Sequence, residues 1–229
     1  MNRLVHSNST TVEDESASKE GRTNDPARTM AEILDVATHE FADKGLAGAR
    51  IDEIAAATRT SKRMIYYYFG SKDGLYLAVL EEAYGRMRRI EADLHLDDLE
   101  PVAALRRLVE FTYDHHQGNE DFIRLVMNEN IHRADYLRQS KVMRQLNSRA
   151  IDSVRALYDR GVGQGVFRPG LAPVDIHAAI SALTVFNVSN RYTFGSIFDR
   201  DDRQAKAETL QREHVVQLIL RFVGYAKNE

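Results

Sequence analysis

Residues 54–72 read IAAATRTSKRMIYYYFGSK, and this stretch decides how the rest of the chain is interpreted. Small and apolar residues at 54–57 favour a helix, and the threonines that follow suit turns and caps better than helix interiors. Ser61 is a good N-cap, since its hydroxyl accepts a hydrogen bond from an amide two or three residues later. Gly70 supplies the left-handed conformation with which many helices end. The stretch therefore predicts two short helices joined by a tight turn, the second over residues 62–69.

The charges in this stretch are all of one sign. It holds four basic residues and no acid, on a chain of net charge -3: Arg59, Lys62, Arg63 and Lys72. Attraction to phosphate is local on the scale of the Debye length, so a basic cluster indicates nucleic-acid binding better than the overall charge does. Ile65 and Phe69 stand four residues apart and share a face that packs inward. The opposite face then points to a DNA groove, as in a helix-turn-helix. The alternative is a solvated basic helix beside aromatic core residues.

The longer segment 51–75, IDEIAAATRTSKRMIYYYFGSKDGL, resembles the DNA-binding signature of the tetracycline-repressor (TetR) family. The matching parts are Ile54-Ala55, Ser61, the variable triplet 62–64, the aromatic run 65–69, and Lys72-acid-x-Leu. Two positions depart from the pattern. Threonines and an arginine at 58–60 replace the usual turn glycine, and Arg50 stands where the family usually has Thr or Ser.

The resemblance implies a set of DNA contacts at matching positions. They are Arg50, Ser61, Lys62, Arg63, Met64, Tyr66, Tyr67, Tyr68 and Lys72. We expect the triplet 62–64 to face base edges. The tyrosine hydroxyls and Lys72 should contact mainly phosphate, which sets the register on a duplex.

Composition places the chain among all-α proteins. Its 229 residues are 43% hydrophobic, rich in Ala, Leu, Arg and Glu, and lack long Val/Ile/Thr alternation. Without cysteine there is no disulfide or thiolate site, which fits a reducing cytoplasm. An apolar run of membrane-spanning length and a secretory signal are both missing, so we expect a cytoplasmic protein without membrane contact.

The chain divides into three predicted parts. Residues 1–25 are rich in Ser, Thr, Asn and acids, and are expected to form a disordered arm. Residues 26–72 form a three-helix helix-turn-helix DNA-binding domain, whose first helix begins at Pro26 and ends at Gly45. Residues 73–229 form a helical ligand-binding and dimerisation domain, and a helix over about 72–92 links the two. A long helix is predicted at about 135–160.

Two late helices, at about 173–191 and 203–226, carry wide apolar stripes. They either complete the core of one subunit or form a four-helix dimer interface with a second copy. The resemblance favours a homodimer, because TetR-like proteins dimerise in this way.

Polar residues interrupt the apolar helices of the second part. In TetR-like proteins this region holds a small-molecule inducer in a largely apolar site with a few polar groups. The candidate ligand residues are Phe111, Phe122, Met127, Asn128, Asn187, Arg191 and Tyr192. Arg191 is the candidate partner for a ligand carboxylate. The alternative for each residue is a cap, a solvated face or a satisfied core contact.

Neither a cofactor nor a metal is predicted. Adjacent histidines such as His115 and His116 point to different faces of a helix and seldom share a metal. Nucleotide-binding loops and hydrolase or metalloprotease motifs are missing from the sequence, so an enzyme is not expected. The resulting hypothesis is a dimeric repressor that binds a palindromic double-stranded DNA operator and is released by an inducer. The alternatives are an activator of the same fold, or a helical small-molecule-binding protein or enzyme.

Overall fold

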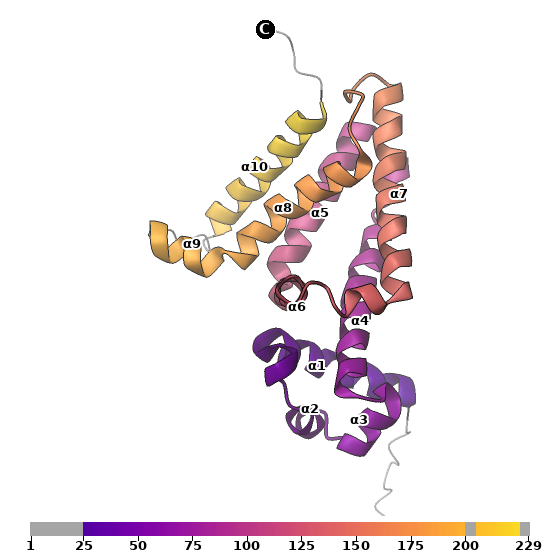
Figure 1. Ribbon diagram of the computed structural model, residues 1–229. Coiled ribbons are helices and arrows are strands. Elements are labelled where there is room, and N and C mark those ends of the chain that lie inside the picture. The colour runs from indigo at the N-terminus through magenta and orange to yellow at the C-terminus, as the bar shows by residue number, and fades with distance from the viewer. Residues whose placement is uncertain (1–24, 200–204, 225–229) are drawn as a thin grey trace, which may run out of the picture.

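The computed structural model describes residues 25–199 and 205–224 (Figure 1). The described residues form helices and turns, with one isolated β-bridge between Phe167 and Gly224, so the predicted all-α fold is confirmed. The predicted disorder of the N-terminal arm falls, Asp25 apart, on residues outside the described ranges.

Helix α1 (Pro26–Gly48) opens the lower half of the molecule, which contains α1 to α3 and the start of the following helix (Figure 1). The Asp25 carboxylate caps it by accepting hydrogen bonds from two backbone amides, and Pro26 takes the first helical position, where its missing N–H is not needed. The backbone leaves helical geometry at Gly45, where φ is +65°, at the residue expected to end the helix. The buried face, which includes Ile33 and Phe41, packs on α4 and α6.

Helices α2 (Ile51–Ala57) and α3 (Lys62–Phe69) are joined by a turn that does without the usual glycine. Arg59 adopts a left-handed φ of +52°. The amides of Arg59 and Thr60 donate to the carbonyls of Ala56 and Ala55, which is the Schellman pattern of a helix C-terminus. The turn geometry is therefore retained with an arginine in the position that glycine adopts most easily.

The junction between α3 and α4 (Lys72–Ala92) depends on a close backbone approach. Gly70 ends α3 with φ of +73°, and the Ser71 hydroxyl caps α4 by accepting from the Gly74 amide at 2.9 Å. A Cβ at Gly74 would lie 2.1 Å from the Phe69 carbonyl oxygen, so only glycine fits there. This contact fixes the direction in which α3 leaves the body.

The second half of the molecule adds, within the described residues, six α-helices and two short 3-10 turns. They are η1 (Leu96–Asp98), α5 (Pro101–Gly118), α6 (Glu120–Ile131), η2 (Leu137–Gln139), α7 (Lys141–Gly163), α8 (Pro173–Ser189), α9 (Arg191–Phe198) and α10 (Ala205–Val223).

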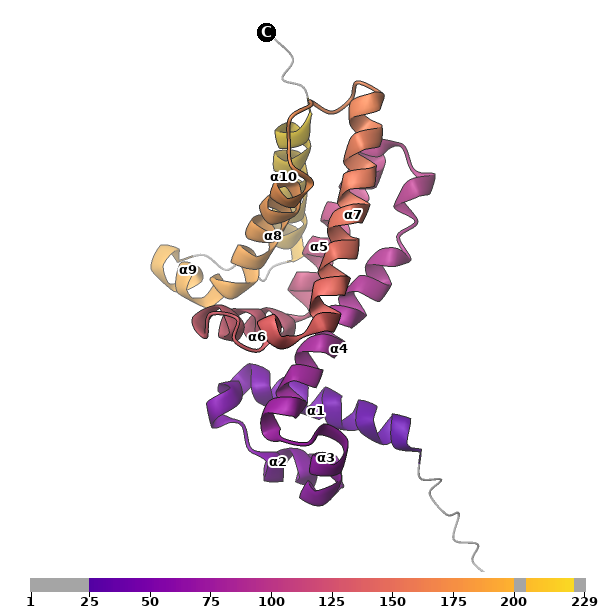
Figure 2. The ribbon, with the colours of Figure 1, turned by 45° about the vertical axis from the view of Figure 1, so that its right-hand side comes forward.

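Two expected helix boundaries were wrong. The long helix begins at Lys141 rather than near residue 135, because consecutive left-handed residues at 133–134 follow the end of α6 and the Ser140 hydroxyl caps α7. The helix expected over 173–191 ends at Ser189, and Arg191 starts the separate helix α9. Arg191, which was expected on the same helix as Asn187, therefore lies on a short arm that projects from the bundle (Figures 1 and 2).

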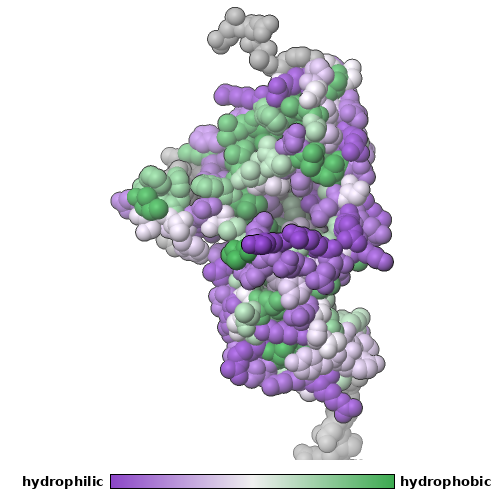
Figure 3. Space-filling view, in the orientation of Figure 1, coloured by the Kyte–Doolittle hydropathy of each residue, from purple (hydrophilic) through white to green (hydrophobic). Residues whose placement is uncertain are grey.

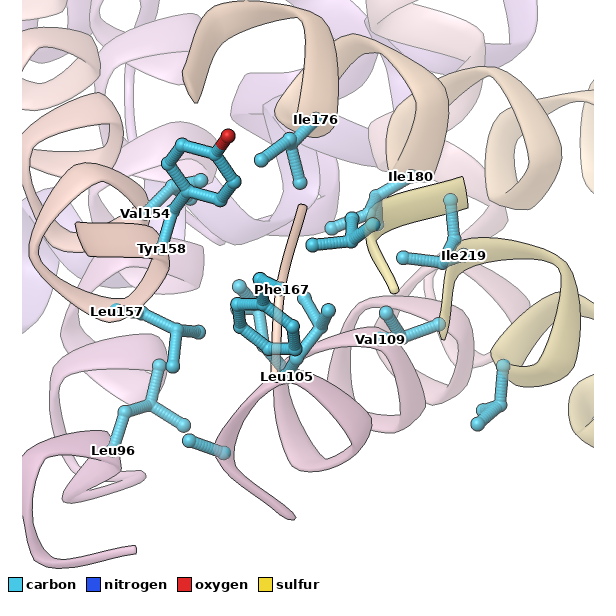
Figure 4. Close-up of a cluster of buried hydrophobic side chains, with 14 of the residues drawn as sticks. Leu96, Leu105, Val109, Val154, Leu157, Tyr158, Phe167, Ile176, Ile180 and Ile219 are labelled. Carbon is cyan, nitrogen blue, oxygen red and sulfur yellow. The ribbon is translucent and has the colours of Figure 1, made fainter. Parts of the chain in front are cut away.

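Phe167 lies at the centre of the upper core, among residues of α5, α7, α8 and α10 (Figure 4). Its ring occupies a notch that Gly161 leaves open, since a Cβ at Gly161 would lie 1.9 Å from a ring carbon. The Tyr158 ring stacks on Phe167 with centroids 6.5 Å apart, and its hydroxyl donates to the Arg168 carbonyl. The Gly-rich segment after α7 therefore contributes Phe167 to the core, while the residues on either side of it are exposed.

Helix α4 runs from the lower half into the upper half, and α6 lies across the top of α1 (Figure 2). The lower core includes Leu125 of α6 together with residues of α1 to α4. The buried Glu129 carboxylate accepts the Leu137 amide at 3.1 Å and is hydrogen-bonded to the Tyr76 side chain of α4. These contacts therefore attach α4 and α6 directly to the lower half.

Candidate DNA interface and effector site

The outward face of α3 carries Lys62, Arg63, Tyr66 and Tyr67, all exposed. On the opposite face Ile65 is fully buried, and Phe69 packs on the lower core. The Ser61 hydroxyl caps the helix by accepting from the Met64 amide at 3.2 Å. The helix thus presents basic and hydroxylated side chains on a surface held firmly from behind.

Three other residues predicted to contact DNA are less accessible or already have a partner in the subunit. Met64 and Tyr68 are half-buried, and Tyr68 stacks edge-on between its two aromatic neighbours. The Lys72 ammonium donates to the Ala47 carbonyl at 3.4 Å, which draws it towards the end of α1. The roles of these residues on DNA stay predictions.

Acids from α2 approach the basic surface, which the sequence stretch alone did not reveal. The Arg50 guanidinium makes two hydrogen bonds to Asp52, at 2.8 and 3.2 Å, and lies 3.6 Å from Glu53. Lys62 lies 3.9 Å from Asp52. The hydrogen bonds from Arg50 lower the pKa of Asp52 to about 2, so this carboxylate is ionised at any working pH. Two of the five Arg50 N–H groups are thus bound within the subunit, and the Asp52 carboxylate offsets its charge.

Arg59 is a basic residue that the predicted set omitted. It is exposed at the turn beside α3. The signal was present in the sequence, because Arg59 belongs to the same acid-free basic stretch.

The seven predicted ligand residues do not surround one cavity. Met127, Asn128 and Tyr192 line a cleft of about 260 Å³ between α1, α6, α8 and α9. Phe122 lines a second cleft, of about 300 Å³, with His115 and residues of α1 and α4. Phe111 packs against the cluster that contains Phe122.

The two remaining predicted residues have protein partners. The Asn187 side-chain carbonyl accepts from Gln211 of α10 at 2.8 Å. The Arg191 guanidinium donates to Gln117 and lies 3.9 Å from Glu120. The carboxylate-binding fork expected at Arg191 is thus already occupied, and a ligand role for this set stays a prediction.

The upper half also buries histidines that the predicted set did not include. His116 lies 2.9 Å from the Thr184 hydroxyl and stacks on Phe122. Because that hydroxyl donates to the Ile180 carbonyl, His116 must donate from Nδ1. Burial, followed by the charges of nearby groups, lowers the pKa of His116 to about 3, so it is neutral at pH 7. Among the described residues, no group of three or more His, Asp or Glu side chains is arranged to hold a metal.

Helices α8 and α10 carry exposed apolar side chains on their outer faces, which no other described part of the subunit covers. The exposed apolar residues on these two helices include Val174, Phe186, Leu210 and Leu218. Figure 3 shows hydrophobic surface over α8 and α10 and at the end of α9. None of the described helices has the length and apolar character needed to cross a bilayer.

Comparison with protein families agrees with this geometry. Residues 33–79 match the model described as bacterial regulatory proteins of the tetR family, and residues 101–219 match the tetracyclin repressor-like C-terminal domain. The chain belongs to the TetR family. The first match covers the helix-turn-helix, and the second covers α5 to α9 and most of α10.

Similar TetR-family proteins include transcriptional repressors. The chain is 37% identical to the HTH-type transcriptional repressor NicS of Pseudomonas putida over 185 residues, which cover 80% of this chain and 87% of NicS. It is 35% identical to the repressor SCO4008 of Streptomyces coelicolor, over 60% of this chain and 69% of that protein.

Solved TetR-family structures share the fold. The regulator SCO4942 of Streptomyces coelicolor aligns with a TM-score of 0.65 and 26% identity, over 85% of this chain and 98% of its own. The hemolysin II regulator HlyIIR aligns with a TM-score of 0.63 at 21% identity, over 88% of this chain and all of its own, which shows the fold alone. TetR-family regulators bind operator DNA and dimerise.

Proposed function

We propose that this TetR-family protein is a transcriptional repressor that binds a palindromic operator as a homodimer and is released by a small-molecule effector. The observation that carries the proposal is the face of α3. Lys62, Arg63 and the neighbouring tyrosines are exposed, while Ile65 anchors the helix from behind. A short helix held in this way can enter the major groove from its N-terminal end.

Dimerisation supplies the specificity that one short helix lacks. One α3 contacts few bases, and a twofold pair reads two half-sites about 34–36 Å apart, one turn of DNA. The outer faces of α8 and α10 supply an apolar surface for a second copy. Packing two helices from each subunit forms a four-helix bundle.

The effector acts through a shift between conformations. A molecule that prefers a dimer with its α3 helices at the wrong spacing lowers operator affinity by no more than its own preference between the two states. Helix α4 is suited to carry the change, because it belongs to both halves of the subunit.

The test is binding of the purified protein to palindromes upstream of its own gene and neighbouring genes, as a function of salt. We expect affinity to fall steeply with salt, and Arg63→Ala to relax preference at one base position, at about 1–3 kcal/mol if the contact is bidentate. Arg155→Ala, on the exposed face of α7, is the matched control and should leave binding unchanged. Binding that ignores salt, or equal effects of the two substitutions, would contradict the proposed docking of α3.

A further inference from the structure

Arg88 of α4 has an incompletely satisfied guanidinium. Its side chain is only 11% exposed, and its Nη1 contacts the Glu91 carboxylate one turn along the helix. Its Nε is buried and has no hydrogen-bond partner among the described residues. Buried polar atoms are nearly always paired, and leaving one unpaired costs free energy, so this atom indicates a missing partner.

Arg88 lines a cleft between α4 and α7. The volume of this cleft is about 220 Å³. Its lining consists of Arg88, Glu91, Ala92, Leu146, Arg149, Ala150 and Ser153. Two guanidinium groups therefore face one carboxylate across a mainly apolar wall. Arg149 is exposed at this cleft and forms no ion pair within the described part of the chain.

Glu91 is the only carboxylate that pairs with Arg88 within the described part of the chain. His115, His116 and His177 are close enough for Arg88 to lower their pKa values, with burial as the larger cause. These imidazoles are neutral at pH 7 and supply no negative charge. His115 is only 8% exposed, and its Nδ1, like the Arg88 Nε, is buried without a partner in the described structure.

We propose that the cleft between α4 and α7 is the anion-binding part of the effector site, where Arg88 and Arg149 hold the carboxylate of a small, partly apolar molecule. This inference rests on the proposed effector-controlled repressor. A planar guanidinium binds a carboxylate through paired, charge-assisted hydrogen bonds. Leu146 and Ala150 supply apolar contact for the rest of the molecule.

The position of Arg88 connects this site to DNA binding. Helix α4 begins at the junction with α3, where Gly74 contacts the Phe69 carbonyl, and continues to Arg88. A carboxylate held between Arg88 and Arg149 joins α4 to α7 and biases the tilt of α4. Arg191, which the sequence suggested for the same task, donates to Gln117 and does not line this cleft.

The binding test uses acetate, butyrate and benzoate, each beside its uncharged amide, with the full-length dimer and no DNA. Isothermal titration calorimetry should detect at least one carboxylate binding and its amide binding at least about tenfold more weakly, as expected for loss of a charged hydrogen bond. Arg88→Gln should weaken that carboxylate by about tenfold or more, and Arg149→Gln should weaken it too. Arg149 is exposed, so its substitution keeps the test valid if Arg88→Gln fails to fold. Arg89→Gln is the matched control, because Arg89 is the next residue on α4 but pairs with Glu82 in solvent.

The second measurement is operator affinity with the carboxylate present. A carboxylate that depends on Arg88 or Arg149 and weakens operator binding supports the proposal. The anion site is refuted if every carboxylate binds no better than its amide. It is also refuted if Arg88→Gln folds and both Arg88→Gln and Arg149→Gln bind the carboxylate as tightly as the wild type. Neither result would contradict the proposed repressor function. If the carboxylate binds but operator affinity is unchanged, the site is not the effector site. Failure of the unliganded protein to bind any operator would instead overturn the proposed function. The calorimetry uses no DNA, so it would still test whether the cleft binds carboxylates.

Discussion

Leu218→Asp should dissociate the proposed dimer without unfolding the subunit. Leu218 lies on the outer face of α10 and is 53% exposed in the isolated subunit. Leu210 stands two turns earlier on the same helix, and Phe186 is exposed on the outer face of neighbouring α8. A carboxylate at position 218 is therefore solvated in a monomer and buried only in a dimer.

The expected loss of dimer stability follows from the half of the Leu218 side chain that is exposed in the isolated subunit. Burying a whole leucine side chain contributes about 1.5–3 kcal/mol, so the exposed half contributes about 1 kcal/mol. A twofold interface contains two copies, which makes about 2 kcal/mol. An unpaired polar group adds about 1–3 kcal/mol for each copy. The dimer should weaken by about 4 kcal/mol or more, which is about a thousandfold in its dissociation constant.

Sedimentation equilibrium over a range of concentrations measures this constant, and circular dichroism checks that the helices remain. Leu218→Ala should weaken the dimer by less, because it removes apolar contact without burying a charge. Val142→Asp is the matched control, since Val142 is 46% exposed in the first turn of α7 and belongs to neither helix of the proposed interface. A folded Leu218→Asp protein that dimerises as tightly as the wild type, or dissociation by Val142→Asp instead, would refute this placement of the interface.

Phe222 is a poorer probe of the same interface. Its ring packs partly against the subunit's own core, and the Arg168 guanidinium lies 5.3 Å from the ring centroid. Phe222→Asp therefore perturbs the folding of one subunit as well as any contact with a second copy. Loss of the dimer in that variant alone says little about the interface.

Three further predictions concern the DNA-binding helices, the core and the response to acid. Asp52→Asn should free Arg50 for an additional phosphate contact and steepen the log–log salt dependence of operator binding by about 0.9 for each additional phosphate that the protein neutralises. A slope equal to that of the wild type would show that Asp52 does not limit the phosphate contacts of Arg50. Gly161→Ala should drive Phe167 from its notch and lower unfolding stability by about 1–3 kcal/mol in chemical denaturation, despite the better helix propensity of alanine; unchanged stability would mean that the loop relaxes freely. His116 is neutral in the folded state, where its pKa is lowered to about 3. Below about pH 6.5 the unfolded chain therefore binds one proton more than the folded chain at this residue, and the free energy of unfolding decreases as the pH is lowered. His116→Gln should flatten this fall by up to about 1.4 kcal/mol per pH unit, and an unaltered slope would assign the titration to other groups.

Local sequence signals were reliable where short-range physics decides the structure. Ser61, Gly70 and Pro26 marked helix ends because capping needs only neighbouring backbone groups. The burial of Ile65 followed from its spacing with Phe69, and the all-α class followed from composition and periodicity. The family also followed from the sequence, because its signature is one continuous stretch that forms one local motif.

Long-range contacts decided what the sequence left open. Asp52 precedes the acid-free stretch, yet the fold places its carboxylate beside Arg50 and Lys62. In the structure Arg191 begins a new helix and donates to Gln117 of α5. The sequence does not distinguish Arg88 from the other arginines of α4, and only packing shows that its Nε is buried without a partner among the described residues. Whether a charged side chain is free, paired or buried without a partner depends on groups distant in sequence. Helix periodicity and composition set which residues share a face, but only tertiary packing sets what that face meets.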